Sequence, residues 1–250
     1  MNPKNNLAEK VVAICQPNFL PWIGYFEMGH RADVYVMLDD VQYVRREWVN
    51  RNKILSKSDQ GWQWVVVPLK KKKRESMINE MEIQNSERWS EKILNTLHHV
   101  YGKAPFYNMY IENLSMILSK ECCLLVDYNI AIIKMVYNIL GIKNNLVLSS
   151  ELDISSKRDD KLTDICEHLG ASIYLANNGS KPYIDQAKFY QKNICFVFQD
   201  YDHPIYSVQQ YTFVPYLSVI DVLFWYGPDA LEIILQGRKQ NWIEENTFDK

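Results

Sequence analysis

The sequence lacks the features of several protein classes. None of its apolar runs reaches the roughly 18 residues that a helix needs to cross a bilayer. The first ten residues, MNPKNNLAEK, have no apolar centre of the kind found in a signal peptide. The five cysteines include no C-x-x-C pair, and their odd number argues against a disulfide framework. We therefore expect a soluble cytoplasmic protein with no membrane span.

Signals for metal and nucleic acid are also missing. Among the five histidines, His98 and His99 are adjacent and point to different faces of a predicted helix, so no pair has metal-ligand spacing. The formal net charge is −2, and no nucleic-acid-binding module is recognisable. One basic run, residues 70–74 (KKKKR), is typical of a solvated loop, although it can also attract an anionic nucleotide or carrier protein. We expect no bound metal and no nucleic-acid partner.

Short apolar runs alternate with amphipathic segments along most of the chain. Residues 11–16 (VVAICQ) form an almost wholly apolar run that ends at a proline, which is typical of a strand buried on both faces. Helical spacing over residues 22–31 and a second apolar run over 33–38 complete a strand–helix–strand unit. Further strands are predicted at 62–68, 146–149, 172–175 and 194–199, and helices at 161–169 and 217–235. This order predicts an α/β fold with a mainly parallel, Rossmann-like sheet and helices on both faces.

The middle of the chain interrupts this alternation. Residues 87–101, 105–120 and 122–140 each carry apolar residues three and four apart, as amphipathic helices do. No internal repeat or low-complexity linker divides the sequence. We therefore expect residues 1–250 to form a single α/β domain with a helical insert at approximately 86–140.

Polar residues follow the first two predicted strands, where parallel sheets bind ligands. The loop after the first strand is stiffened by Pro17 and Pro21 and presents Gln16 and Asn18. Asp39, Asp40 and Gln42 follow the second strand, and we expect them to face the same crevice. Neighbouring strand side chains point in opposite directions, so at most one carboxylate points inward, and we favour Asp39. Its role is either to hold and deprotonate an amine or to cap the turn after the strand.

Three later segments add candidate binding groups. Asn50 and Arg51 lie in a polar and aromatic segment, where the guanidinium of Arg51 suits a phosphate or forms a surface ion pair. Ser155, Ser156 and Arg158 precede a predicted helix and can bind an anion, while Ser156 also suits a plain N-cap. These residues are predicted to contact substrate.

The segment YDHPIY follows the last predicted strand. His203 lies there before a proline, and Tyr206 ends the segment. A histidine on a rigid loop is the usual general base for an amine nucleophile, so we predict His203 to be catalytic and Tyr206 to bind substrate. The alternative is a structural histidine bonded to Asp202 or to the backbone.

Two short segments resemble the signatures of the HIGH-superfamily nucleotidyltransferases. Residues 22–25 (WIGY) are similar to the H-x-G-H signature, with Trp22 and Tyr25 at the two histidine positions. Residues 154–158 (ISSKR) resemble the second phosphate-binding signature. The resemblance implies a related fold in which Trp22 and Tyr25 contact substrate. Because the imidazoles that stabilise a pentacovalent phosphate are missing, it implies no nucleotidyl transfer.

A longer resemblance covers about residues 11–235. The blocks QPNFLPWIGYF, ADVYVMLDDVQYVRREWVNRNKI, SSKRDDKL, YDHPIY and LSVIDVLFWYG are similar, in that order, to those of the WbqC-like family. Members are commonly encoded in bacterial polysaccharide loci, including O-antigen clusters. The resemblance therefore implies a part in surface-polysaccharide biosynthesis, and it suggests a transferase that passes an acyl or aminoacyl group to a nucleotide-linked amino sugar.

The same resemblance implies the partners. These are a nucleotide-linked sugar and an acyl donor, either a coenzyme A thioester or an acyl-carrier-protein thioester as cosubstrate, with no required cofactor. The family commonly has a histidine where this chain has Cys15, which argues against Cys15 as a required nucleophile. Because Cys15 lies in an apolar strand, we expect a buried thiol and direct attack by the amine, with thioester exchange onto Cys15 as the alternative. The alternative function is a non-catalytic nucleotide-sugar-binding or scaffolding protein with a degenerate nucleotidyltransferase-like fold.

Overall fold

A five-stranded parallel sheet organises the computed structural model, which describes residues 9–85, 88–120, 122–180, 184–208 and 212–239. The strand order is β5-β2-β1-β6-β7, and every neighbouring pair is parallel. The strands are β1 (Val11–Cys15), β2 (Val34–Met37), β5 (Asn145–Leu148), β6 (Ile173–Ala176) and β7 (Cys195–Phe198). The predicted α/β class and the mainly parallel sheet are confirmed.

The central strands are apolar because both of their faces are covered. In β1, Val12 and Ile14 belong to one buried cluster, whereas Val11 and Ala13 belong to the other. Alternate residues of a strand point to opposite faces, so a strand between two cores must be apolar at nearly every position. This requirement explains the VVAIC run.

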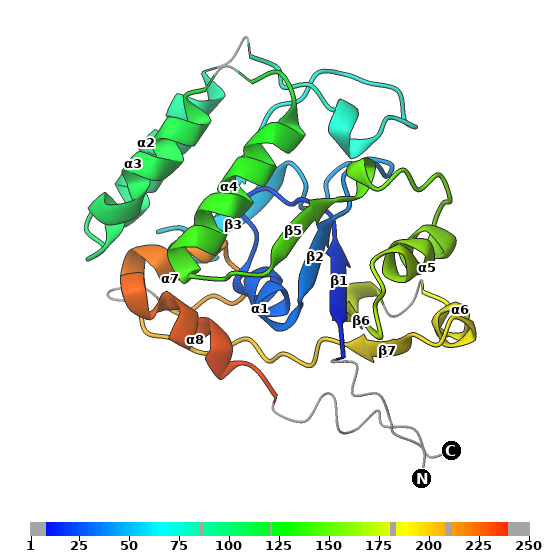
Figure 1. The fold of residues 1–250 in the computed structure, drawn as a ribbon. Coiled ribbons are helices and arrows are strands. Elements are labelled where there is room, and N and C mark those ends of the chain that lie inside the picture. Colours follow the sequence, from blue (N-terminus) through cyan, green and yellow to red (C-terminus); the bar gives the residue numbers. More distant parts are fainter. Residues whose placement is uncertain (1–8, 86–87, 121, 181–183, 209–211, 240–250) are drawn as a thin grey trace.

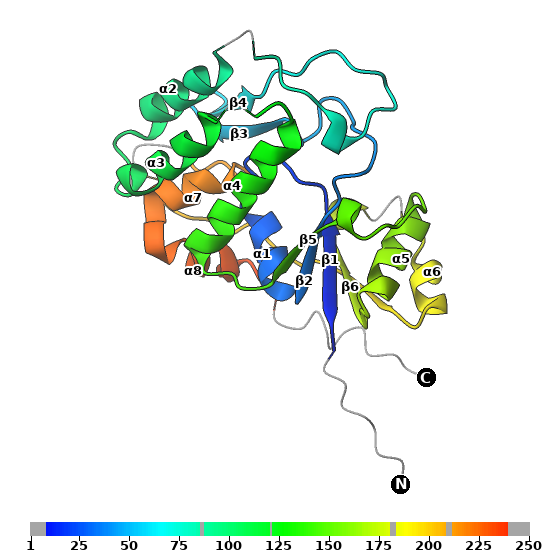
Figure 2. The same cartoon turned by 45° about the horizontal axis from the view of Figure 1, so that its top comes forward.

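Helices lie on both faces of the sheet, as Figures 1 and 2 show. One side carries α1 (Ile23–Arg31), α4 (Leu125–Leu140), α7 (Val219–Tyr226) and α8 (Ala230–Gln236), and the other carries α5 (Asp159–His168) and α6 (Gln186–Gln191). Short 3₁₀ turns occur at η1 (Ile78–Glu80), η2 (Ser149–Glu151), η3 (Asn178–Ser180) and η4 (Gly227–Asp229). Within the described ranges, no helix is both long enough and apolar enough to cross a membrane.

The predicted helical segment contains α2 (Trp89–Tyr101) and α3 (Tyr107–Leu118) as well as α4. All three helices contact the rest of the fold: Tyr101 of α2 and Tyr107 of α3 pack against Phe224 of α7, and α4 contacts the loop after β1. Asn129 on α4 donates from Nδ2 to the carbonyls of Pro17 and Val49, both at 2.8 Å. Tyr137 packs against Phe26 of α1 at a ring-centroid distance of 5.7 Å. The segment is thus bonded to the loop that follows β1.

A second, two-stranded sheet lies beyond the carboxyl ends of β1 and β2 (Figure 2). It consists of β3 (Arg51–Leu55) and β4 (Trp62–Val66), paired antiparallel. The strand near 62–68 is as predicted, but β3 was not predicted because its sequence, RNKIL, is polar. The structure shows why this sequence is compatible with a strand: the cations of Arg51 and Lys53 lie 4.1 Å from the ring centroids of Trp64 and Trp62.

Candidate functional site

The chain adds strands on both sides of β1. From β1 the chain continues to β2 on one side, while β6 and β7 are added on the other. Open α/β sheets bind ligands at such a switch point, outside the carboxyl ends of the strands. A cleft of about 260 Å³ lies there, bordered by Cys15 and Gln16 after β1 and by Asn177 after β6. We call it the switch-point cleft.

The lining of the cleft combines neutral hydrogen-bonding groups with apolar side chains. Its amides can both donate and accept hydrogen bonds, as recognition of sugar hydroxyls requires. Trp48 adds an exposed ring, and Glu47 is the one carboxylate among its described lining residues, which include no cation. The full described lining is Ile14, Cys15, Gln16, Asn18, Leu38, Glu47, Trp48, Leu162, Tyr174, Asn177, Ser180 and Ile184.

Two buried asparagines fix the loop that carries Gln16 and Asn18. Asn52 donates from Nδ2 to the carbonyls of Phe19 (3.2 Å) and Leu20 (2.7 Å). Asn129 holds the carbonyl of Pro17 in the same way. Buried carbonyls need such partners, so both amides position the loop. Sequence analysis missed them, although an asparagine on the apolar face of a predicted helix is a usable signal for Asn129.

Cys15 borders the cleft but is poorly suited to be a nucleophile. Asn177 Nδ2 lies 4.0 Å from its Sγ. Burial raises the pKa of the Cys15 thiol to about 11. Since the thiolate is the reactive form, this raised pKa disfavours Cys15 as a nucleophile at neutral pH, although the side chain is only partly buried.

Asp39 and Asp40 lie in a polar cluster that joins the ends of β2 and β5. Asp39 is buried, and Ser150 donates to both of its oxygens, from the backbone to Oδ1 (3.0 Å) and from Oγ to Oδ2 (2.7 Å). Asp40 Oδ2 pairs with Lys161 Nζ at 2.7 Å, and Lys161 is itself buried. Ser149 Oγ lies within hydrogen-bond distance of both carboxylates. These contacts match the structural alternative for Asp39, in which it holds two strand ends together.

His203 lies among aromatic rings on the α1 side of the sheet. Its ring stacks on Trp22, at a centroid distance of 6.1 Å, and contacts Tyr216 at 5.2 Å. His203 Nδ1 lies 2.9 Å from the carbonyl of Pro204, which makes this nitrogen the donor. Burial lowers the pKa of His203, so the ring is neutral near pH 7 and Nε2 is a free acceptor within the described chain. The ring can act as a base, but His203 is not among the lining residues of the switch-point cleft.

Two predicted binding residues lie in the core. Tyr25 is buried against Tyr35 at a centroid distance of 5.1 Å. Tyr206 is also buried and donates to Asp221 Oδ2 at 2.8 Å. Neither borders the cleft. Substrate contact by Tyr25 and Tyr206 therefore stays a prediction, and what the structure shows for both is a packing role.

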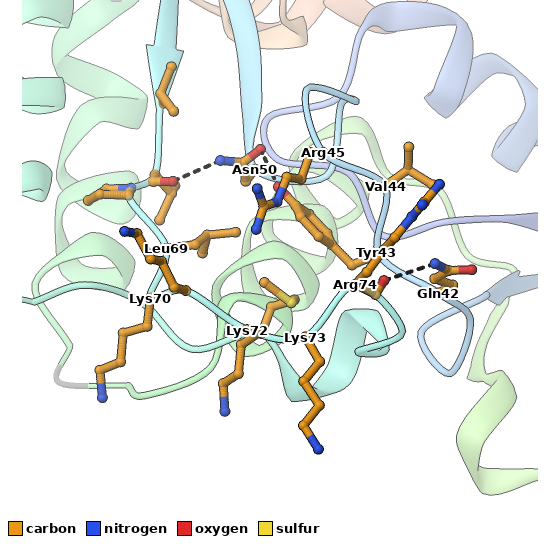
Figure 3. A pocket seen from close by; sticks show the side chains of 15 residues that line it. Gln42, Tyr43, Val44, Arg45, Asn50, Leu69, Lys70, Lys72, Lys73 and Arg74 are labelled. Carbon is orange, nitrogen blue, oxygen red and sulfur yellow. Dashed lines mark hydrogen bonds between the residues drawn. The ribbon is translucent and has the colours of Figure 1, made fainter.

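The other predicted residues lie in several parts of the structure. Gln42 and Asn50 border a second, larger hollow, whose described lining includes six cationic residues (Figure 3). Arg51 begins β3 and lies over Trp64, with an Nη2 hydrogen bond to the carbonyl of Arg46. Ser155, Ser156 and Arg158 precede α5, where Ser155 and Arg158 are exposed. Of the predicted set, the switch-point cleft brings together Gln16 and Asn18.

Two comparisons with known proteins give matches over most of the chain. The model of the WbqC-like protein family matches residues 16–233. An uncharacterized protein of Mycobacterium tuberculosis, Rv1507c, is 30% identical over 233 residues, which cover 92% of this chain and 100% of the relative. No solved structure matches the chain. The match over most of the chain shows that this protein belongs to the WbqC-like protein family.

Proposed function

We propose that the protein is a transferase of bacterial surface-polysaccharide biosynthesis, including that of O-antigen, which acylates or aminoacylates the amine of a nucleotide-linked sugar. The observation that carries the proposal is the switch-point cleft, where this type of sheet binds ligands. Gln16, Asn18 and Asn177 supply amides for sugar hydroxyls, and Trp48 offers a flat apolar surface for a sugar ring. Family membership agrees with this setting but specifies no reaction.

The proposed step needs few protein groups. The sugar amine attacks the acyl carbon of a thioester, a C–N bond forms, the C–S bond breaks, and the thiol leaves with the proton that the amine gives up. A base that accepts this proton during the attack speeds the reaction. The neutral ring of His203 has a suitable protonation state but does not line the cleft, so His203 can serve as this base only if the bound amine reaches beyond the cleft lining. The high pKa of Cys15 disfavours a covalent acyl-enzyme. The cosubstrate is a coenzyme A or carrier-protein thioester.

One observation favours a second function, which is binding without catalysis. The two residues chosen as catalytic groups are both engaged in structural contacts: Asp39 is bonded to Ser150, and His203 is stacked on Trp22. In that case the protein holds a nucleotide-linked sugar for a partner enzyme. The two functions share the cleft and differ in whether acylated sugar appears.

The test combines binding with product analysis. The protein is titrated with nucleoside diphosphate amino sugars in a calorimeter and is then incubated with each sugar plus acetyl-coenzyme A, aminoacyl-coenzyme A or a loaded carrier protein. Mass spectrometry reads the acylated product. We expect to find a sugar that binds the Asn18→Ala variant about 5- to 30-fold more weakly than the wild type, because a lost hydrogen bond to a bound polar group costs about 1–2 kcal/mol.

His203→Ala separates the two functions. The transferase predicts a loss of about a hundredfold in turnover with sugar binding retained, which is the usual scale for removing a general base. His168→Ala, an exposed histidine on α5, is the matched control and should change neither value. Sugar binding without product from any donor would establish the binding function, and the absence of binding by every sugar would refute both.

A further inference from the structure

A groove of about 1150 Å³ opens beside the β3–β4 hairpin, and the proposed sugar site leaves it unused. Its walls are the segment after β2 and the loop after β4, as Figure 3 shows. We call it the basic groove. Its described lining is Gln42, Tyr43, Val44, Arg45, Asn50, Val66, Val67, Pro68, Leu69, Lys70, Lys71, Lys72, Lys73, Arg74 and Met81.

The described lining includes six cations and no carboxylate. Lys70 and Lys72 pair with Glu82, and these ion pairs lower the pKa of Glu82 to about 2. The other four cations, Arg45, Lys71, Lys73 and Arg74, form no ion pair within the described ranges. The whole chain has a formal net charge of −2, so this positive charge is local. A polyanion is the complementary ligand.

The lining of the groove also includes apolar side chains and an aromatic ring held by hydrogen bonds. Tyr43 Oη donates to Asn50 Oδ1 at 2.9 Å, and Asn50 Nδ2 donates to the carbonyl of Val67 at 2.9 Å (Figure 3). These bonds fix the Tyr43 ring beside Leu69 and Met81, which also line the groove. A planar aromatic group can pack on such a surface while its anionic groups contact the cations at the rim.

The basic groove and the switch-point cleft share one wall. Arg45 and Asn50 line the groove, whereas Glu47 and Trp48, between them in the sequence, line the cleft. The backbone N–H of Phe19 donates to the carbonyl of Trp48 at 3.0 Å, which fastens this wall to the loop of the cleft. A ligand bound by its phosphates in the groove must therefore reach around residues 45–50 to act in the cleft.

We propose that the basic groove binds the 3′-phosphoadenosine diphosphate part of a coenzyme A thioester, which makes coenzyme A the acyl donor of the proposed transfer. This ligand has an aromatic base, and its three phosphates bring roughly four negative charges, which matches the four cations without ion pairs. Its long pantetheine arm separates the phosphates from the reacting carbon. A nucleotide-linked sugar lacks such an arm, because its diphosphate is attached directly to the sugar.

Coenzyme A itself, without any acyl group or sugar, is the probe. Calorimetry compares the wild type with the double variant Lys73→Gln/Arg74→Gln, in which the groove loses two charges but the backbone carbonyl of Arg74 still accepts from Gln42. Lys103→Gln/Lys134→Gln removes two exposed charges outside both hollows and is the matched control. We expect the groove variant to bind at least about tenfold more weakly and the control to stay within about twofold.

A second ligand tests the phosphate contacts. 3′-Dephospho-coenzyme A should bind the wild type more weakly than coenzyme A does, and this preference should shrink in the groove variant. Equal melting temperatures of all variants ensure that folding does not explain a loss. Equal binding of coenzyme A by the wild type and the groove variant, or no binding at all, would overturn the proposal.

The outcomes also separate this proposal from the proposed function on which it rests. Coenzyme A binding that depends on Lys73 and Arg74, without acyl transfer to any sugar, supports the groove assignment and refutes the transferase. Transfer from a loaded carrier protein by a chain that does not bind coenzyme A supports the transferase and overturns the groove assignment.

Discussion

Asp221 allows a direct test of how burial shifts the pKa of a carboxyl group in this protein. It lies in the first turn of α7, is fully buried, and accepts a hydrogen bond from Tyr206 at 2.8 Å. Burial raises its pKa from 3.8 to about 6, although the hydrogen bonds from Tyr206 and Tyr101 lower it in part. The folded protein therefore holds a proton on Asp221 at a pH where the unfolded chain has released it.

The difference between the folded-state and unfolded-state pKa of Asp221 sets the size and the sign of its effect on the free energy of unfolding. A shift of roughly two pKa units corresponds to about 3 kcal/mol. Because the folded-state pKa is the higher one, Asp221 lowers the free energy of unfolding progressively as the pH rises from about 4 to about 6, and the full loss is present above pH 6. An asparagine has nearly the same shape and does not ionise.

The assay is urea unfolding of the wild type and Asp221→Asn between pH 4 and pH 7.5. We expect the free energy of unfolding of the variant, relative to the wild type, to rise by about 3 kcal/mol across this range. Asp59→Asn, at an exposed aspartate in the hairpin turn, should give a flat difference. A flat difference for Asp221→Asn as well would show that the buried carboxyl titrates normally and would refute the reasoning.

Three further predictions concern the cleft loop, a buried ion pair and the cysteines. Asn52→Ala should lower the free energy of unfolding by about 2–4 kcal/mol in urea, because two buried carbonyls of loop 16–22 lose their partner; a change below about 0.5 kcal/mol would contradict this. Glu27→Gln should cost about 3–5 kcal/mol in the same assay, since the buried Glu27 carboxylate pairs with both Arg31 and Arg238, and an unchanged midpoint would be the contrary result. Iodoacetamide should modify exposed Cys123 well before Cys15, whose thiol pKa is about 11, and peptide mass spectrometry showing the reverse order would restore Cys15 as a nucleophile.

The strands of the main sheet could be predicted because their signal is local. Residues 11–15 and 34–37 are apolar at nearly every position, and this pattern follows directly from burial on both faces. The polar strand β3 could not be predicted in this way, because its charged side chains lie over tryptophans of β4 that the sequence does not show to be neighbours. Helix α6, with six residues, was also missed, being too short to show a periodic pattern.

The candidate site was harder to predict because its partners are distant in the sequence. Asp39 looks like a free carboxylate until Ser149 and Ser150, about 110 residues later, are placed against it. Gln16 and Trp22 are close in the chain, but Gln16 lines the cleft whereas Trp22 stacks on His203. Position after a strand predicted that Gln16 and Asn18 lie beyond the end of β1, but the sequence does not show which hollow a residue borders or which contacts already engage it.

The central position of β1 has a consequence for synthesis of the chain. Its edge opposite β2 pairs with β6, and Lys10 just before it donates to Ser172, 162 residues away. Glu27 on the following helix pairs with Arg238, 211 residues away. While the ribosome synthesises the residues between β1 and β6, one edge of the apolar strand β1 therefore has no partner. Pairing of strands that are so far apart in the sequence is slow. We expect the nascent chain to need protection by chaperones until β6 emerges, and the full-length protein to refold best when dilute and cold.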